Sequence, residues 1–143
     1  MSRHPVPITL VLATICAGPA LSQDLDAVAA APGNHRVILE NDDVRVLEVT
    51  VAPGETEPVH EHRWPSVMHI QTPQPFIDIV YKRVDGRLVE DRRIVKRGIT
   101  PPPALWFGPQ EPHATRNTGT QTFRALRVEL KRGASAAPVA APH

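Results

Sequence analysis

The chain has 143 residues, with 16 Lys and Arg against 15 Asp and Glu, and a formal net charge of +1 when the histidines are neutral. This length is enough for one domain with one core. The near-zero net charge gives no electrostatic basis for binding nucleic acid or an anionic membrane surface, so both are excluded as partners. Cys16 is the only cysteine, which excludes an internal disulfide.

The first 22 residues have the pattern of a secretory signal peptide. A short basic start with Arg3 precedes an uncharged apolar run from Ile8 to Ala20, and Ala20-Leu21-Ser22 places small residues where a signal peptidase cleaves. The run is shorter than the ~20 apolar residues that span a bilayer comfortably, and an uncleaved anchor is the alternative. We expect a periplasmic or secreted protein with no membrane contact after cleavage. Cleavage removes Arg3 and Cys16 and leaves 15 basic (16 − 1) against 15 acidic residues.

Short β-rich segments separated by turn residues follow one another after the signal. Asp85-Gly86 stands between two of them, and Asp-Gly is a strong hairpin signal because both central residues need a positive φ. No segment shows a sustained 3.6-residue apolar period, so the pattern predicts an all-β sandwich or barrel. The expected strands cover residues 36–40, 44–51, 59–62, 66–71, 76–84, 87–95, 104–107, 114–116 and 122–130.

The composition divides the chain into four segments. Residues 1–22 form the signal peptide, and residues 23–34, rich in Ala, Asp, Pro and Gly, form a partly ordered leader. Residues 35–131 form a single antiparallel barrel. Residues 132–143 are mostly Ala and Pro and form a disordered tail.

Two stretches carry the candidate chemistry. His60 and His62 lie two residues apart on an expected strand, so their side chains point to the same face and Glu61 points to the other. Two imidazoles at that spacing can chelate one metal ion. A second stretch, residues 108–119, contains His113.

These two stretches resemble the paired motifs of the cupin family. In the first motif Gly54, His60 and His62 stand at the family spacing, and in the second motif His113 and Asn117 match the His-x-x-x-Asn pattern. The resemblance implies an antiparallel double-stranded β-helix, or jelly-roll barrel, with a metal ion held by His60, His62 and His113.

The chain departs from the family pattern at its fourth ligand. Ser66 or Val67 stands where the family has a glutamate, and Gly108 and Gln110 replace the Pro-x-Gly that precedes the second histidine. The resemblance therefore implies three of the four usual ligands, as in some cupin dioxygenases. Such an ion keeps its full dipositive charge and favours an anionic ligand at its open positions.

The identity of the metal and the reaction stay open. Neutral imidazole suits iron, zinc, copper and nickel, and manganese is a further candidate. If the protein is an enzyme, the metal allows oxygenation or Lewis-acid chemistry on a small anionic molecule. The alternative is a non-catalytic or metal-free barrel that binds a ligand or a partner, in which the histidines only form hydrogen bonds. A metal-free isomerase ranks last, since Tyr81 is the only tyrosine.

Several other residues are candidates for the pocket. Loop residues Glu55, Glu57 and Glu111 lie close to the motifs in the sequence and are candidate general bases, whereas no partner is assigned to His35. If Ser66 takes the glutamate position, strand alternation directs His69 outward. The expected substrate-pocket residues are Arg63, Trp64, Ser66, Met68 and Trp106.

A homodimer is the expected assembly. Barrels of this type bury an exposed strand edge or sheet face by pairing. Val37, Leu39 and His69 are candidates for that surface.

Overall fold

A computed structural model describes residues 24–98 and 100–132, which form one short helix and nine strands. The predicted signal peptide and nearly all of the predicted tail lie outside these residues. No helix in the described part of the chain is long and apolar enough to cross a bilayer. The elements are α1 (Ala27–Ala30), β1 (His35–Glu40), β2 (Val44–Val51), β3 (His60–His62), β4 (Ser66–Thr72), β5 (Phe76–Val84), β6 (Arg87–Lys96), β7 (Leu105–Phe107), β8 (Gln110–Asn117) and β9 (Phe123–Leu130).

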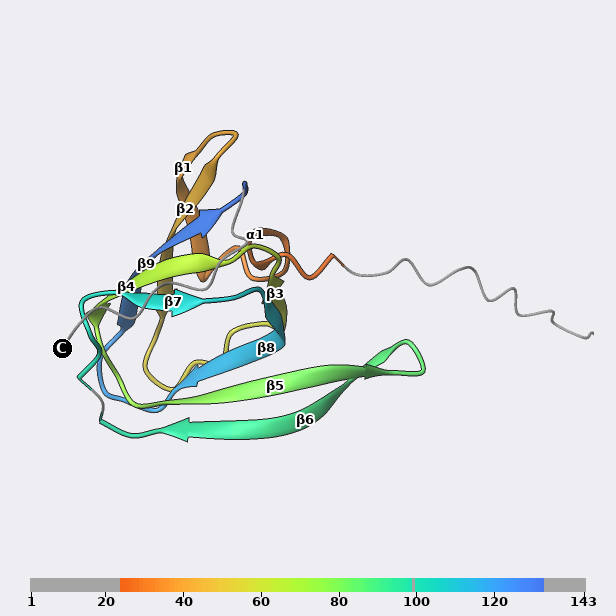
Figure 1. Ribbon diagram of the computed structural model, residues 1–143. Coiled ribbons are helices and arrows are strands. Elements are labelled where there is room, and N and C mark those ends of the chain that lie inside the picture. The colour runs from red at the N-terminus through yellow and green to blue at the C-terminus, as the bar shows by residue number, and fades with distance from the viewer. Residues whose placement is uncertain (1–23, 99, 133–143) are drawn as a thin grey trace, which may run out of the picture.

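The strands form two antiparallel sheets that enclose the interior (Figure 1). One sheet has the order β1-β2-β9-β4-β7 and the other the order β3-β8-β5-β6. β1 and β2, and β5 and β6, are consecutive in the chain, whereas neighbours such as β2 and β9 or β3 and β8 are distant, so the sheets are built from crossovers as well as hairpins. The all-β prediction is confirmed.

The turn between β5 and β6 explains why these strands pair from the turn onward, with one register shift between Val80 and Tyr81. Asp85 has φ 49° and Gly86 has φ 76°, so both central residues are left-handed. This is the backbone of a two-residue turn whose twist matches that of the flanking strands. The register then runs from Val84 opposite Arg87 toward Phe76 opposite Lys96. The hairpin prediction is confirmed.

The two motif stretches meet through backbone hydrogen bonds. The Gly54 N–H donates to the carbonyl of Asn117 (3.0 Å), and the Asn117 N–H donates to the carbonyl of Glu55 (3.0 Å). Gly54 has φ 77°, which favours glycine. The buried side-chain amide of Asn117 donates to the carbonyl oxygens of Val51 and Gln121. These two matched positions therefore shape the loops beside the histidines.

The inner face of the five-stranded sheet is apolar toward one end and charged toward the other. Leu47, Val49 and Ala125 form the buried core cluster. The same alternation along β2 and β9 buries Arg45, with Arg127 and Glu129 on the neighbouring strand. Buried charges need partners, so this end of the interior is held by ion pairs.

The described part of the predicted leader, residues 24–34, is packed against the barrel. Leu25, Ala27 and Ala31 are buried, and small side chains let α1 approach closely. The Leu25 carbonyl accepts from the N–H of Glu61 on β3 (2.6 Å). The Asp26 carboxylate caps α1 by accepting from the Val28 N–H (3.1 Å). The N-terminal segment thus packs against β3, the strand that carries His60 and His62.

Arg45 joins this segment to the barrel. Its Nη1 and Nη2 donate to the two Asp26 oxygens at 2.9 Å each, and its Nε donates to Glu129 Oε2 at 2.6 Å. Burial alone would lower the pKa of Arg45, but the hydrogen bonds to the two carboxylates outweigh it and raise that pKa. The three side chains form one buried, charge-compensated network.

Removing the central cation of this network should destabilise the fold. Arg45→Met leaves two buried carboxylates without their counter-ion, and we expect a loss of about 3–5 kcal/mol in the free energy of unfolding. The control is Arg36→Met, which breaks the exposed pair with Glu48 and should cost about 1 kcal/mol or less. Urea unfolding measures both. Equal losses in the two variants would contradict a structural role for the buried network.

Candidate metal centre

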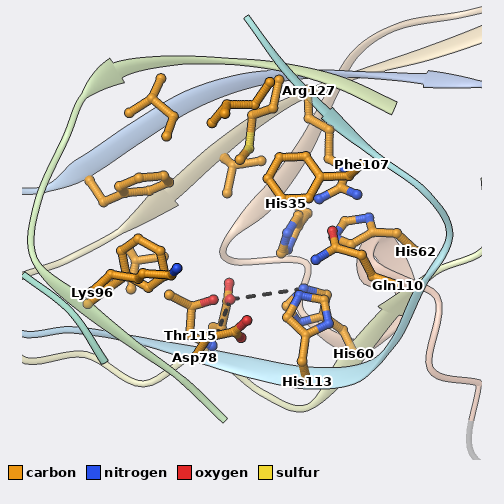
Figure 2. A pocket seen from close by; sticks show the side chains of 18 of the residues that line it. His35, His60, His62, Asp78, Lys96, Phe107, Gln110, His113, Thr115 and Arg127 are labelled. Atoms are coloured by element: carbon orange, nitrogen blue, oxygen red, sulfur yellow. Dashed lines mark hydrogen bonds and ion pairs between the residues drawn. The ribbon is translucent and has the colours of Figure 1, made fainter. Parts of the chain in front are cut away.

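Four histidine rings converge at one end of the interior (Figure 2). The three predicted ligands lie together: the ring centroids of His60 and His62 are 5.1 Å apart, those of His60 and His113 are 4.5 Å apart, and those of His62 and His113 are 5.7 Å apart. The structure therefore gathers the residues of both motifs at one point. Whether they hold an ion stays a prediction.

The strand pairing explains this convergence. His60 and His62 are buried on one face of β3, and His60 lies directly opposite His113 of β8. The next pair is His62 with Gln110, so β8 has one more residue than β3 between the two pairs. This bulge turns Gln110 as well as His113 toward the cavity, as bulges do where a strand must re-aim a side chain.

The fourth ring belongs to His35, the first residue of β1. Its centroid lies 4.4 Å from that of His60 and 5.3 Å from that of His62, and the side chain is 3% exposed. One ligand atom from each of His35, His60 and His62 can be chosen so that all lie within 4.8 Å of one another. The resemblance to cupin motifs missed this residue because it lies outside both motifs. The signal that could have found it is its alternation with Val37, but this applies only if the strand begins at His35, as β1 does, and not at Arg36 as expected.

Each ring is oriented by a hydrogen bond that its Nδ1 donates to an oxygen. The partners are oxygens that accept only, so Nδ1 carries the proton in the neutral ring and Nε2 keeps its lone pair. A metal-binding imidazole is fixed in this way, through its second nitrogen. The distances are 3.4 Å from His35 to Ala31 O, 3.0 Å from His60 to Pro58 O, 2.7 Å from His62 to Glu129 Oε1 and 2.8 Å from His113 to Glu111 O.

The rings are neutral at pH 7. Burial is the largest cause and lowers the pKa of all four, and the nearby positive charge of Arg127 acts in the same direction. For His35 the pKa falls from 6.5 to about 4. Neutral imidazole is the form that ligates metals, so the cluster fits a divalent ion without first losing protons.

Buried carboxyl groups flank the cluster. The family glutamate has no counterpart, because Ser66 is fully buried at that position and offers only a hydroxyl. Glu57 is 4% exposed and approaches from the loop, with Oε1 4.0 Å from His60 Nε2. Its Oε1 accepts from the Thr115 N–H (3.0 Å). Burial raises the pKa of Glu57 to about 7, so this carboxyl is poised between its neutral and charged forms.

The histidines line one end of a cavity of about 350 Å³. Of the predicted pocket residues, only Met68 lines it. Trp106 does not, because the alternation along β7 turns Leu105 and Phe107 inward instead. Ser66 is buried but lies outside the cavity wall.

Arg63 and Trp64 lie away from the cavity as well. The Arg63 side chain is half-exposed and pairs with Asp24 and Glu61. The Arg45 guanidinium lies over Trp64, with its central carbon 4.8 Å from the centroid of the Trp64 ring. Alternation turns Arg63 to the face opposite His60 and His62, and the bend at Trp64 and Pro65 after β3 takes the Trp64 side chain out of that alternation. His69 is exposed as expected and its Nδ1 bonds to the carbonyl of Pro103 (2.7 Å).

Acid should destabilise the metal-free protein. Each ring has a lower pKa when folded, so below pH 6.5 the unfolded chain binds more protons and the free energy of unfolding falls. For His35 the loss runs from about pH 6.5 to pH 4, at about 1.4 kcal/mol per pH unit. Urea unfolding at pH 7, 6 and 5 should show this trend, with a shallower slope in His35→Gln. A pH-independent urea midpoint over this range would contradict it.

Similar solved structures include cupin proteins. A cupin domain from Bordetella pertussis matches with a TM-score of 0.50 at 20% identity, over 68% of this chain and 92% of that one. A cupin superfamily protein from Desulfitobacterium hafniense gives 0.43 at 20% identity, over 67% and 74% of the two chains. An RmlC-like cupin with a double-stranded β-helix from Methanocaldococcus jannaschii gives 0.43 at 11% identity, over 67% and 77%. No protein-family model and no curated protein matches the sequence. With its two facing antiparallel sheets and their crossover topology, the chain has the cupin fold, a double-stranded β-helix.

Proposed function

We propose that this protein is an exported cupin that holds one divalent metal ion on its buried histidines and binds a small anionic molecule at the open positions of that ion. The observation that carries the proposal is the orientation of the rings. All four are anchored through Nδ1, which leaves the Nε2 lone pair of each ring free; ligand atoms of His35, His60 and His62 lie within 4.8 Å of one another, and the His113 ring lies beside them, 4.5 Å from that of His60. Anchoring of this kind, on neutral rings, is typical of metal-binding histidines.

His60, His62 and His113 are the proposed ligands, with His35 as a fourth. A bound iron, zinc, copper, nickel or manganese ion supplies Lewis-acid or oxygen chemistry in such a site. The chain itself supplies Glu57 beside His60. Because the pKa of Glu57 is raised to about 7, this carboxyl can hold or release a proton at neutral pH.

The preference for an anion follows from charge. Four imidazoles are neutral donors, so they do not reduce the charge of the ion. Ser66 leaves the family carboxylate position without a charge. An anionic ligand would therefore balance a charge that the chain leaves uncompensated.

The alternative is a metal-free pocket. In that case the Nδ1 bonds and the ring contacts serve packing alone, and the cavity binds a neutral or anionic guest directly. Metal analysis separates the two.

The purified protein should bind about one ion per chain after loading with each of the five metals in turn and desalting. His60→Ala, His62→Ala and His113→Ala should each lose most of the ion, because two remaining rings of the predicted set cannot fix its geometry. If His35 is a fourth ligand, His35→Ala should also lose metal. If the ion has three ligands, this variant should bind as much metal as the wild type. Elemental mass spectrometry reads metal per chain.

The matched control is His69→Ala. It removes the same ring type with the same kind of Nδ1–carbonyl bond, but from an exposed position. It should bind as much metal as the wild type. Two results would contradict the metal site: a wild type that binds none of the five ions, or a His113→Ala variant that binds as much metal as the wild type. Either result would leave a metal-free binding pocket as the proposed function.

We also propose export and dimerisation. Export is supported by the apolar run and small residues before residue 23. Dimerisation is supported by β1, an edge strand whose Ile38 and Leu39 are 44% and 50% exposed. Apolar side chains on a sheet edge are a surface that pairing would bury.

One preparation tests both. Protein recovered from the exported fraction should have the intact mass of the chain without residues 1–22 and a native mass, by light scattering, of twice that value. A full-length subunit mass would contradict cleavage. A native mass of one subunit at micromolar concentration would contradict the dimer, and Leu39→Asp should produce that monomer if β1 is the interface.

A further inference from the structure

Arg127 is a buried cation without a hydrogen-bonding partner for two of its nitrogens. It lies on β9, is 4% exposed and faces the cavity. Its Nε and Nη2 are buried and make no hydrogen bond to any residue in the described part of the chain. A guanidinium in this state has lost its hydration without regaining an equal partner.

The nearest carboxylate is already engaged. Glu129 Oε1 lies 4.0 Å from Arg127 Nε, beyond hydrogen-bond distance, and accepts from His62, while Oε2 accepts from Arg45. Burial, the largest cause, lowers the pKa of Arg127 to about 10, so the group is still charged at neutral pH. Arg45 shows the contrast, because all three of its nitrogens donate to carboxylate oxygens of Asp26 and Glu129.

The free nitrogens have the geometry of a carboxylate clamp. Nε and Nη2 are the pair that lies side by side on a guanidinium and can bind both oxygens of one carboxylate. The Phe107 ring lies 5.6 Å from the guanidinium carbon and restrains its plane. Figure 2 shows Arg127 close to His62 and Phe107, at the histidine side of the cavity. A carboxylate held there would lie on the histidine side of the cavity.

The rest of the cavity wall is mainly apolar. Val51, Ile70, Phe76, Ile94 and Phe123 line it away from the histidines. Lys96 lies across the cavity from Arg127 but is exposed, so water satisfies its ammonium group. A volume of about 350 Å³ is at the small end of the roughly 300–1,000 Å³ range of ligand pockets.

We infer that the site takes a small monocarboxylate with an apolar body, whose carboxylate pairs with Nε and Nη2 of Arg127 and whose body lies on the apolar wall. This narrows the anion of the proposed function to one class and rests on that proposal only in sharing its cavity. The carboxylate clamp itself needs no metal. Arg127 is therefore the specificity-determining residue for the ligand.

Calorimetric titration tests this with hexanoate and benzoate as probes. Hexanamide and benzamide are their uncharged counterparts, and acetate keeps the carboxylate without the body. At least one of the two carboxylates should bind the wild type more tightly than its amide and more tightly than acetate. In Arg127→Met its binding should weaken by about tenfold to a hundredfold, the worth of a charged hydrogen-bonded pair. Arg127→Lys, which keeps the charge but loses the fork, should weaken it as well.

Arg124→Met is the matched control, because Arg124 is on the same strand but exposed. It should bind both probes like the wild type. Arg127→Met should also have a thermal midpoint equal to or above that of the wild type, since it removes a buried charge without breaking a hydrogen bond. A lower midpoint with unchanged probe affinity would assign Arg127 to the fold and overturn the inference.

Metal content measured on the same samples keeps the two proposals apart. If the wild type holds no metal but the probe affinity depends on Arg127, the clamp stands and the metal proposal fails. If removing the metal with a chelator abolishes binding while Arg127→Met binds like the wild type, the ion alone holds the anion and the clamp fails. No binding of either carboxylate by metal-free or metal-loaded protein would also overturn it.

Discussion

One fully buried carboxylate, that of Glu129, connects the parts of this interior. It accepts from Arg45 on one oxygen and from His62 on the other, and so joins the five-stranded sheet to β3. Arg45 in turn holds Asp26 at the cap of α1. A carboxylate without water needs such donors, and removing one exposes the others to the cost of burial. The orientation of a candidate metal ligand thus depends on a chain of charges that begins in the N-terminal segment.

The two buried arginines of the interior show how the same fold serves stability and binding. Arg45 is compensated by two carboxylates, which makes it part of the fold. Arg127 lies on the adjacent strand and the same inner face. It makes no hydrogen bond to Glu129, because the two oxygens of that carboxylate already accept from Arg45 and His62. Its charge also helps to lower the pKa of His35, His60 and His62. The interior therefore keeps the rings neutral and leaves Nε and Nη2 of Arg127 without a hydrogen-bond acceptor among the described residues.

Sequence patterns correctly predicted those features of the fold that depend only on neighbouring residues. Alternation placed His60 and His62 on one face, and Asp85-Gly86 set the β5–β6 hairpin, because neighbouring residues decide both. The parity of a short strand such as β7 depends on where pairing begins, so Trp106 could not be assigned to a face. His35 and Arg127 reach the cavity because β1, β2 and β9 are neighbours in one sheet, and that order is a property of the whole fold.

His35 shows how a residue outside the motifs changes the chemistry of the site. The Ala31 carbonyl after α1 accepts from the backbone N–H and from the ring of His35, so the packed N-terminal segment places the ring 4.4 Å from His60. A neutral ring then stands near a site where the family pattern supplies a carboxylate. As a ligand it would add a donor without subtracting charge, which strengthens the need for an anion from outside. A neutral ring from β1 in place of a motif carboxylate, and the two Arg127 nitrogens without a hydrogen-bond partner, are thus two independent observations that support the proposed anionic ligand.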